Sequence, residues 1–277
     1  MNRLTRTSTA ATALALLAIT TLAGCSSTPA SGAAGAEGVV SPGKLTVCMN
    51  AAYAPMEYYE GTDTSNPVGF DVDLAKAAAK QLHLEFVPVE VSLKGIIPAL
   101  NAGRCDVAWS SLYVTAERSA AASPVPYMKT GYALLVHKND NSIHALTDLA
   151  GKTLAYQTGS ADEPKLTDLQ HQLAAAHLKP VQPLGTDAGV DVVQNLLNGK
   201  ADAAFQTDVS TADVIKKTGN KLKAVPNAYP ADNSIGAYTN KGAPINKKLI
   251  AALKAVREAG ISAKIAAKWG LDAQHLI

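Results

Sequence analysis

Short apolar runs alternate with amphipathic stretches along most of this chain. The apolar runs are bounded by Gly, Pro or charged residues, as is typical of short strands. They predict strands at residues 45–49, 85–91, 107–109, 132–137, 153–156, 181–184, 201–205 and 236–239. Helical spacing of apolar residues predicts helices at residues 69–82, 96–100, 163–177, 190–197, 245–259 and 262–269. Strands that alternate with helices indicate βαβ units and mostly parallel sheets.

Some single residues refine this prediction. Asp71 is a candidate N-cap for the first predicted helix. Pro88 lacks the N–H that a central strand needs, so we expect the second predicted strand at a sheet edge. The stretch 50–59 is too irregular for a helix and is predicted to be a loop.

Two stretches repeat one pattern about 95 residues apart. Residues 102–109 (AGRCDVAW) and 198–205 (NGKADAAF) share a glycine, a basic residue, an aspartate, an alanine and an aromatic residue in register. Each stretch follows a predicted helix and opens a predicted strand. Two copies of one unit suggest two similar lobes rather than one continuous sheet, with a chance similarity as the alternative.

Composition and charge exclude some classes of protein. The 277 residues are 47% hydrophobic, which excludes disorder of the whole chain and allows one large or two modest domains. There are 25 Lys and Arg against 23 Asp and Glu. Arg3 and Arg6 lie in a predicted leader, so the rest of the chain has no net charge. It therefore lacks the excess of positive charge that is typical of nucleic-acid-binding proteins.

The first residues predict export and attachment to a membrane. Two arginines precede an apolar stretch from Ala10 to Leu22 that is too short to span a membrane as a mature helix. The sequence Leu-Ala-Gly-Cys that ends at Cys25 resembles the bacterial lipobox. We therefore predict a signal peptide at 1–24, a lipid-modified Cys25 and a flexible linker at 25–43, with an ordinary cleaved leader as the alternative.

Two cysteines remain in the predicted mature chain, Cys48 and Cys105. In an exported protein such a pair favours a disulfide. The alternative is two separate buried thiols that behave as small hydrophobic groups.

One stretch has the features of an anion site. Ser110 and Ser111 follow the apolar run 107–109, where a buried strand would reach the edge of its sheet that faces a ligand crevice. Arg118 comes seven residues later, and its planar fork of donors suits a carboxylate. The alternative is a solvated surface arginine after two loop serines.

No residue pattern indicates a cofactor. The six histidines lack the spacing of metal ligands, and no Cys-x-x-Cys occurs. The sequence Gly-Lys-Thr at 151–153 lacks the first glycine of a phosphate-binding loop and is predicted to be a turn into a strand. We therefore predict neither a metal nor a cofactor.

Several short motifs occur in the order typical of one protein family. They are 53–57 (YAPME), 69–74 (GFDVDL), 95–100 (GIIPAL), 110–118 (SSLYVTAER), 157–160 (QTGS) and 268–270 (KWG). The chain resembles the family 3 bacterial extracellular solute-binding proteins, the polar amino-acid receptors of ABC importers. The resemblance runs from about Lys44 to Gly270.

The resemblance implies a two-lobed α/β fold, the type II periplasmic-binding-protein fold, with two hinge crossings. Lobe 1 would comprise 44–130 and 237–277, and lobe 2 would comprise 131–236. The lobes would close around a small amino acid or a similar carboxylate. A monomer anchored outside the cytoplasm would then deliver this ligand to ABC permease subunits.

The resemblance also implies roles for individual residues. Arg118 would bind the α-carboxylate, with help from Ser111 and Ser160, and Tyr53 would cover the ligand's side chain. The complete predicted ligand site is Asn50, Tyr53, Leu93, Ser110, Ser111, Tyr113, Arg118, Gly159, Ser160, Thr207 and Asp208.

Four of these positions depart from the family's pattern. Tyr113 stands where many members have a small hydroxyl residue, and Thr207 stands where the family commonly has an aspartate for the ligand's ammonium. Asp208 comes one residue later, so it is either a displaced ammonium partner or a helix N-cap. Asn50 replaces an acid of the basic-amino-acid receptors and argues against a cationic ligand side chain.

Two other functions stay open on the sequence. Dehydratases of arogenate or prephenate share this fold and need a carboxylic acid as proton donor in the cleft. The candidates for that donor are Glu57, Glu163 and Asp208. The chain could also be a ligand receptor for a membrane sensor instead of a transporter.

Overall fold

The computed structural model describes residues 38–62, 64–226, 228–229 and 233–277. The predicted signal peptide 1–24, Cys25 and most of the predicted linker lie outside the described residues. Within the described ranges, no helix is both long enough and apolar enough to cross a membrane.

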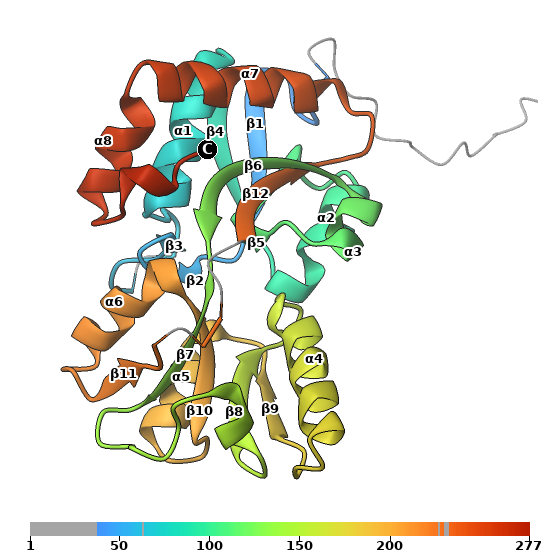
Figure 1. Cartoon of the computed structure of the whole chain (residues 1–277). Coiled ribbons are helices and arrows are strands. Elements are labelled where there is room, and N and C mark those ends of the chain that lie inside the picture. The colour runs from blue at the N-terminus through green and yellow to red at the C-terminus, as the bar shows by residue number, and fades with distance from the viewer. Residues whose placement is uncertain (1–37, 63, 227, 230–232) are drawn as a thin grey trace, which may run out of the picture. The chain divides into compact units, whose positions relative to one another are not determined.

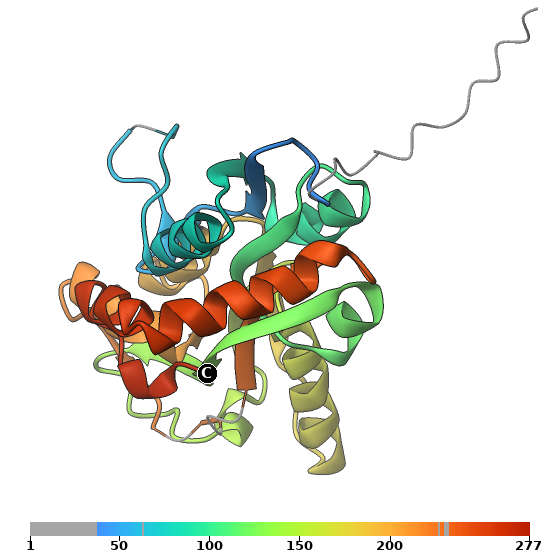
Figure 2. The same ribbon diagram turned by 90° about the horizontal axis from the view of Figure 1, so that it is seen from above.

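Two five-stranded sheets organise the chain, and we call each sheet with its helices a lobe (Figure 1). The strand order of the first sheet is β4-β1-β5-β12-β6. Its strands are β1 (Lys44–Met49), β4 (Glu85–Glu90), β5 (Val107–Tyr113), β6 (Ser123–Thr130) and β12 (Asn233–Thr239). Its helices are α1 (Phe70–Gln81), α2 (Ile96–Asn101), α3 (Ala116–Ala121), α7 (Pro244–Glu258) and α8 (Ile261–Lys268). Figure 2 shows α7 beside α1.

The second sheet has the order β11-β7-β10-β8-β9. Its strands are β7 (Tyr132–His137), β8 (Thr153–Gln157), β9 (Gln182–Thr186), β10 (Ala203–Thr207) and β11 (Leu222–Ala224). Its helices are α4 (Asp162–Ala175), α5 (Gly189–Leu197) and α6 (Asp208–Lys217). The chain passes from the first sheet to the second after Thr130 and returns before Asn233, which gives the two crossings that the resemblance implies.

The sheets are more mixed than the prediction of mostly parallel sheets. In the first sheet β12 is antiparallel to both β5 and β6, and in the second β7 is antiparallel to both β10 and β11. Strand β6 was not predicted because Pro124 and Pro126 interrupt its pattern. Both prolines are tolerated because β6 is an edge strand, and the predicted edge position of β4, with Pro88, is confirmed.

The repeated sequence pattern corresponds to one structural unit in each sheet. Asp106 accepts a hydrogen bond from the backbone N–H of Thr46 at 2.8 Å, and Asp202 accepts one from Thr153 at 2.7 Å. Each aspartate therefore fastens the strand that it opens to the parallel neighbour, β5 to β1 and β10 to β8. The prediction of two similar lobes is confirmed.

Asp71 does not cap α1. Gly69 is the N-cap residue, and the Asp71 side chain is buried, where it accepts hydrogen bonds from the Tyr127 hydroxyl at 2.7 and 2.8 Å. Gly69 has a φ of 130°, and a Cβ there would lie 2.2 Å from the backbone oxygen of Met56. This close approach binds the start of α1 to the hairpin of β2 (Ala52–Tyr53) and β3 (Glu57–Tyr58), which was predicted to be a loop.

Two contacts fix the start of the first lobe. Cys48 and Cys105 form a disulfide, with their Cα atoms 5.7 Å apart and both residues fully buried. The last part of the predicted flexible linker, from residue 38 on, packs against the first lobe: Val39 is buried in the core and the Val40 N–H donates to Asp106.

Candidate functional site

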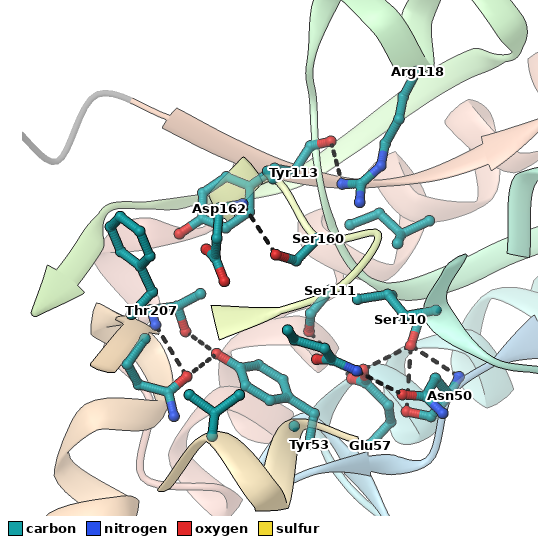
Figure 3. Close-up of a pocket in the computed structure, with 18 residues that line it drawn as sticks. Asn50, Tyr53, Glu57, Ser110, Ser111, Tyr113, Arg118, Ser160, Asp162 and Thr207 are labelled. Carbon is teal, nitrogen blue, oxygen red and sulfur yellow. Dashed lines mark hydrogen bonds between the residues drawn. The ribbon is translucent and has the colours of Figure 1, made fainter. Parts of the chain in front are cut away.

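A cavity of about 70 Å³ lies between the two lobes. Residues from both sheets line it, and Figure 3 shows their side chains around the cavity. The lining residues are Asn50, Tyr53, Glu57, Leu93, Ser110, Ser111, Leu112, Tyr113, Arg118, Gln157, Ser160, Ala161, Asp162, Gly189, Val192, Phe205, Gln206 and Thr207. Nine of the eleven predicted ligand residues are therefore brought together here.

Strand β5 positions the two serines within the strand rather than after it. Ser110 is buried, accepts a hydrogen bond from the Asn50 N–H at 3.0 Å and donates to Glu57 at 2.8 Å. Ser111 has a φ of 47°, in the left-handed region. Its backbone N–H donates to Asp71 at 2.7 Å, which holds this unusual conformation in place.

Glu57 and Asp71 form a buried pair of acids beneath the serines. Burial and the neighbouring carboxylate raise the pKa of Glu57 well above its usual range. Burial raises the pKa of Asp71 to about 6, although hydrogen bonds from Tyr127 and Ser111 oppose the shift. Burial therefore favours the protonated form of Glu57, and both of its oxygens are bonded to serine hydroxyls, so the side chain forms part of the cavity wall.

Arg118 lies at the boundary between the lobes. It follows the N-cap Thr115 of α3, and its Nη1 donates to the Tyr113 carbonyl at 3.2 Å. Its Nη2 donates across the cleft to the Gly159 carbonyl at 3.0 Å. Burial lowers the pKa of the guanidinium from its usual value. Two fixed carbonyl contacts leave other N–H donors of this half-buried fork for a carboxylate in the cavity.

Tyr53 crosses from the first lobe to the second. Its hydroxyl contacts the hydroxyl of Thr207, the hydroxyl of Ser210 at 2.8 Å and the amide oxygen of Gln206 at 3.0 Å. The Gln157 amide makes a similar bridge, donating to the Asn50 side chain at 3.3 Å. These contacts hold the lobes against each other around the cavity.

Two predicted residues do not line the cavity. Asp208 accepts hydrogen bonds from the Thr130 hydroxyl at 2.6 Å and the Gly131 N–H at 2.8 Å, so its carboxylate fastens the first crossing. It is not the N-cap of α6 either, because Thr207 has that position. Gly159 contacts Arg118 through its carbonyl, and a Cβ on this residue would lie 2.6 Å from the Cα of Lys94.

The Tyr113 hydroxyl does not replace the small hydroxyl donor of the family's pattern, because it binds the protein backbone. Its hydroxyl donates to the Gly131 carbonyl at 2.9 Å, and its ring stacks on Tyr132 with centroids 4.4 Å apart. The residue therefore presents an aromatic face to the cavity, where the family's pattern has a hydroxyl.

The sequence prediction missed Asp162, the first residue of α4. Burial raises its pKa to about 6, and hydrogen bonds with Ser160 and the backbone of Gln157 offset part of the shift. A signal was available, because Asp162 comes two residues after the predicted Ser160. In sequence Asp162 looks no different from the neighbouring Glu163, which in the structure is exposed and accepts a hydrogen bond from the Gly159 N–H.

The described part of the chain offers no candidate site for a metal ion. No group of three or more His, Cys, Asp or Glu side chains there is arranged to hold a metal ion. The site thus contains one cation (Arg118), a fully buried acid (Glu57), a partly buried acid (Asp162), hydroxyls, amides and aromatic rings. Such a set suits a small molecule that carries both signs of charge.

Comparisons with known proteins agree with this geometry. Residues 45–272 match the family described as bacterial extracellular solute-binding proteins, family 3. The chain is 30% identical over 228 residues to the arginine-binding extracellular protein ArtP of Bacillus subtilis (strain 168), covering 82% of this chain and 86% of that protein.

Two solved structures are similar in fold and sequence. An ancestral arginine-binding protein bound to arginine has a TM-score of 0.75 and 29% identity, over 82% of this chain and 98% of that one. An ancestral amino acid-binding protein, a precursor of cyclohexadienyl dehydratase, has a TM-score of 0.72 and 27% identity, over 82% and 95%.

Proposed function

Because this chain belongs to the family 3 bacterial extracellular solute-binding proteins, we propose that it binds an amino acid between its lobes and delivers it to the permease of an ABC importer. The observation that carries the proposal is the half-buried Arg118 fork at the cavity, which contacts both lobes. A ligand carboxylate on this fork would complete the contact between the lobes and favour their closure.

A thermal-shift screen of the twenty L-amino acids tests the proposal. A ligand that binds only the folded chain raises its melting temperature by mass action. We expect a clear rise with a small subset of the amino acids, followed by saturable binding in calorimetry. If no amino acid changes the melting temperature or gives heat of binding, the proposal is wrong.

We also propose that the mature chain is a monomeric lipoprotein outside the cytoplasm, anchored through Cys25. The leader with its two arginines and the Leu-Ala-Gly-Cys sequence support this. Lobe 1 would comprise 44–130 and 237–277, and lobe 2 would comprise 131–236. Mass analysis of the mature N-terminus should find an acylated Cys25, and a free serine or alanine terminus would contradict the anchor.

Delivery to a permease distinguishes this proposal from a sensor. Deleting the gene should abolish high-affinity uptake of the amino acid found in the screen. Uptake that continues unchanged while a signalling response is lost would identify a sensor's receptor instead.

We further propose that the site binds its ligand without chemistry. The three acids predicted as proton donors are all engaged: Glu57 by both serines, Glu163 by the Gly159 N–H and Asp208 by the first crossing. Incubation with prephenate should leave it unchanged. Formation of phenylpyruvate would contradict this part of the proposal.

Tyr53→Phe should weaken binding of the amino acid about fivefold. The substitution keeps the ring over the cavity and removes the hydroxyl that contacts the second lobe, and a net hydrogen bond is worth about 1 kcal/mol. Calorimetry measures the change. Tyr59→Phe is the matched control, because that hydroxyl binds Glu90 outside the cavity. If both substitutions weakened binding equally, the Tyr53 hydroxyl would have no specific role in ligand binding.

A further inference from the structure

The cavity contains only three side chains of charged type among its described lining residues: Arg118, Glu57 and Asp162. Glu57 is fully buried, burial raises its pKa, and both of its carboxylate oxygens accept hydrogen bonds from the two serine hydroxyls. Among the described lining residues, Asp162 is therefore the acid whose carboxylate is left for a ligand. An amino acid held by Arg118 through its carboxylate must place its ammonium group somewhere else in this cavity.

Thr207 cannot supply a negative charge for that ammonium. It lies at the end of β10, and its hydroxyl is bonded to the hydroxyls of Tyr53 and Ser210. The acid that follows it, Asp208, is used by Thr130 and Gly131. An ammonium at this end of the cavity would meet only neutral groups from β10, which would leave the buried cation unpaired.

Asp162 approaches the same end of the cavity from another element. Figure 3 shows its carboxylate on the side where Tyr113 and Thr207 lie, away from Arg118. Its charge acts on the hydroxyl groups of Tyr53 and Tyr113. Among the described residues, no Lys, Arg or His forms an ion pair with it. Burial makes the ionised form of a carboxylate costly, and a ligand cation that pairs with it offsets that cost.

We infer that Asp162, at the start of α4, binds the ammonium group of the amino acid and replaces the acid that β10 lacks. This inference rests on the proposed function. Arg118 and Asp162 then bind the two charges of a zwitterion from opposite sides, with the aromatic face of Tyr113 as the wall between them. The ligand class is an α-amino acid with a free amino group, and the corresponding α-hydroxy acid is discriminated against.

Asp162→Asn tests the inference with a ratio of affinities. The probe is the L-amino acid that gives the largest thermal shift, compared with the α-hydroxy acid that has the same side chain. We expect the wild type to prefer the amino acid by roughly 30-fold or more, and Asp162→Asn to reduce this preference to about threefold or less. A general structural defect would weaken both compounds equally.

Two further variants sharpen the test. Asp168→Asn removes a carboxylate from the same helix at an exposed position, where the acid forms an ion pair with Lys165, and should keep the wild-type ratio. Adding Thr207→Asp to Asp162→Asn should restore part of the ratio, because it returns an acid to the same end of the cavity.

Proton linkage gives a second readout. Burial raises the pKa of Asp162 to about 6, so affinity for the amino acid should fall about tenfold from pH 7.5 to pH 5, because binding requires the ionised form. The tyrosines near Asp162 have raised pKa values and stay protonated in this range. The groups that face Asp162 are Tyr53, Tyr113, Arg118, Tyr132, Glu163 and Tyr229. The part of the pH dependence that Asp162→Asn removes belongs to Asp162, and the remainder is assigned to the coupled pair Glu57 and Asp71.

The outcomes separate the two proposals. If Asp162→Asn keeps the wild-type ratio while Arg118→Ala loses binding, the ammonium assignment is wrong and the proposed function stands. If the wild type binds no amino acid, both proposals are wrong. A collapsed ratio with partial restoration by Thr207→Asp supports the assignment.

Discussion

We expect Arg118→Ala to weaken binding of the amino acid by about 3 kcal/mol, which is roughly 150-fold in Kd. The substitution leaves a buried carboxylate without its charged partner and also removes the contacts to the carbonyls of Tyr113 and Gly159. Isothermal titration calorimetry measures the change. Arg118→Lys should give an intermediate loss, because it keeps the charge but not the planar fork.

Arg104→Ala is the matched control for this experiment. Arg104 is exposed in the turn before β5, so its removal changes the net charge equally without touching the cavity. Its affinity should equal that of the wild type. An Arg118→Ala variant that binds as tightly as Arg104→Ala would overturn the assignment of the carboxylate site.

We expect the second large effect from the disulfide. Replacing both Cys48 and Cys105 by Ala should lower the free energy of unfolding by roughly 4 kcal/mol, because the bridge closes a long loop in the unfolded chain. The two residues are 57 positions apart. Alanine is the better substitute here, since the bridge is buried among Ile96, Leu100 and Leu112 and a serine hydroxyl would find no water.

Chemical denaturation with and without reductant measures the effect of the bridge. The reduced wild type keeps both sulfur atoms, so its difference from the oxidised protein isolates the cross-link from the loss of side-chain volume. We expect the midpoint to fall on reduction and to fall slightly further in the double variant. An unchanged midpoint in all three samples would show that the bridge contributes nothing.

The disulfide also bears on the site. Cys48 lies in β1 two residues before Asn50, and Cys105 lies just before β5, whose serines line the cavity. Loss of the bridge should therefore make the two segments that carry these cavity residues, one around Asn50 and one around Ser110 and Ser111, less rigid.

Much of the fold follows from local sequence patterns. The strands and helices with clear periodicity were predicted. So were the two lobes, because the pattern of residues 102–109 recurs at residues 198–205. In the structure, Asp106 and Asp202 of this pattern make the same contact in each sheet. Strand β6 was missed because two prolines make it look like a loop until its edge position is known. The direction of β7 and β12 was missed because both strands are mostly buried and read as continuous apolar runs, the pattern that is typical of parallel strands.

Site residues could be predicted where a sequence motif identifies them, and could not where their role depends on tertiary packing. Arg118 and the two serines follow from the order of residues in and just after β5. Asp71 looks like a helix cap, and only the packing of Tyr127 against it shows that it is buried. Asp208 and Asp162 are both acids that begin helices, and the sequence alone cannot tell that one binds the crossing and the other faces the cavity.

The place of β12 between β5 and β6 determines when the first sheet can be completed. The strands of the second sheet lie within residues 132–224, so all of them are present before β12 leaves the ribosome or the export channel. Until then β5 exposes an unpaired edge and β6 has no neighbouring strand in this sheet, and unpaired edges of this kind template aggregation. A chain that stops before Asn233 keeps a full set of strands for one lobe and leaves a strand-wide gap in the other, which an extended segment of another protein could fill.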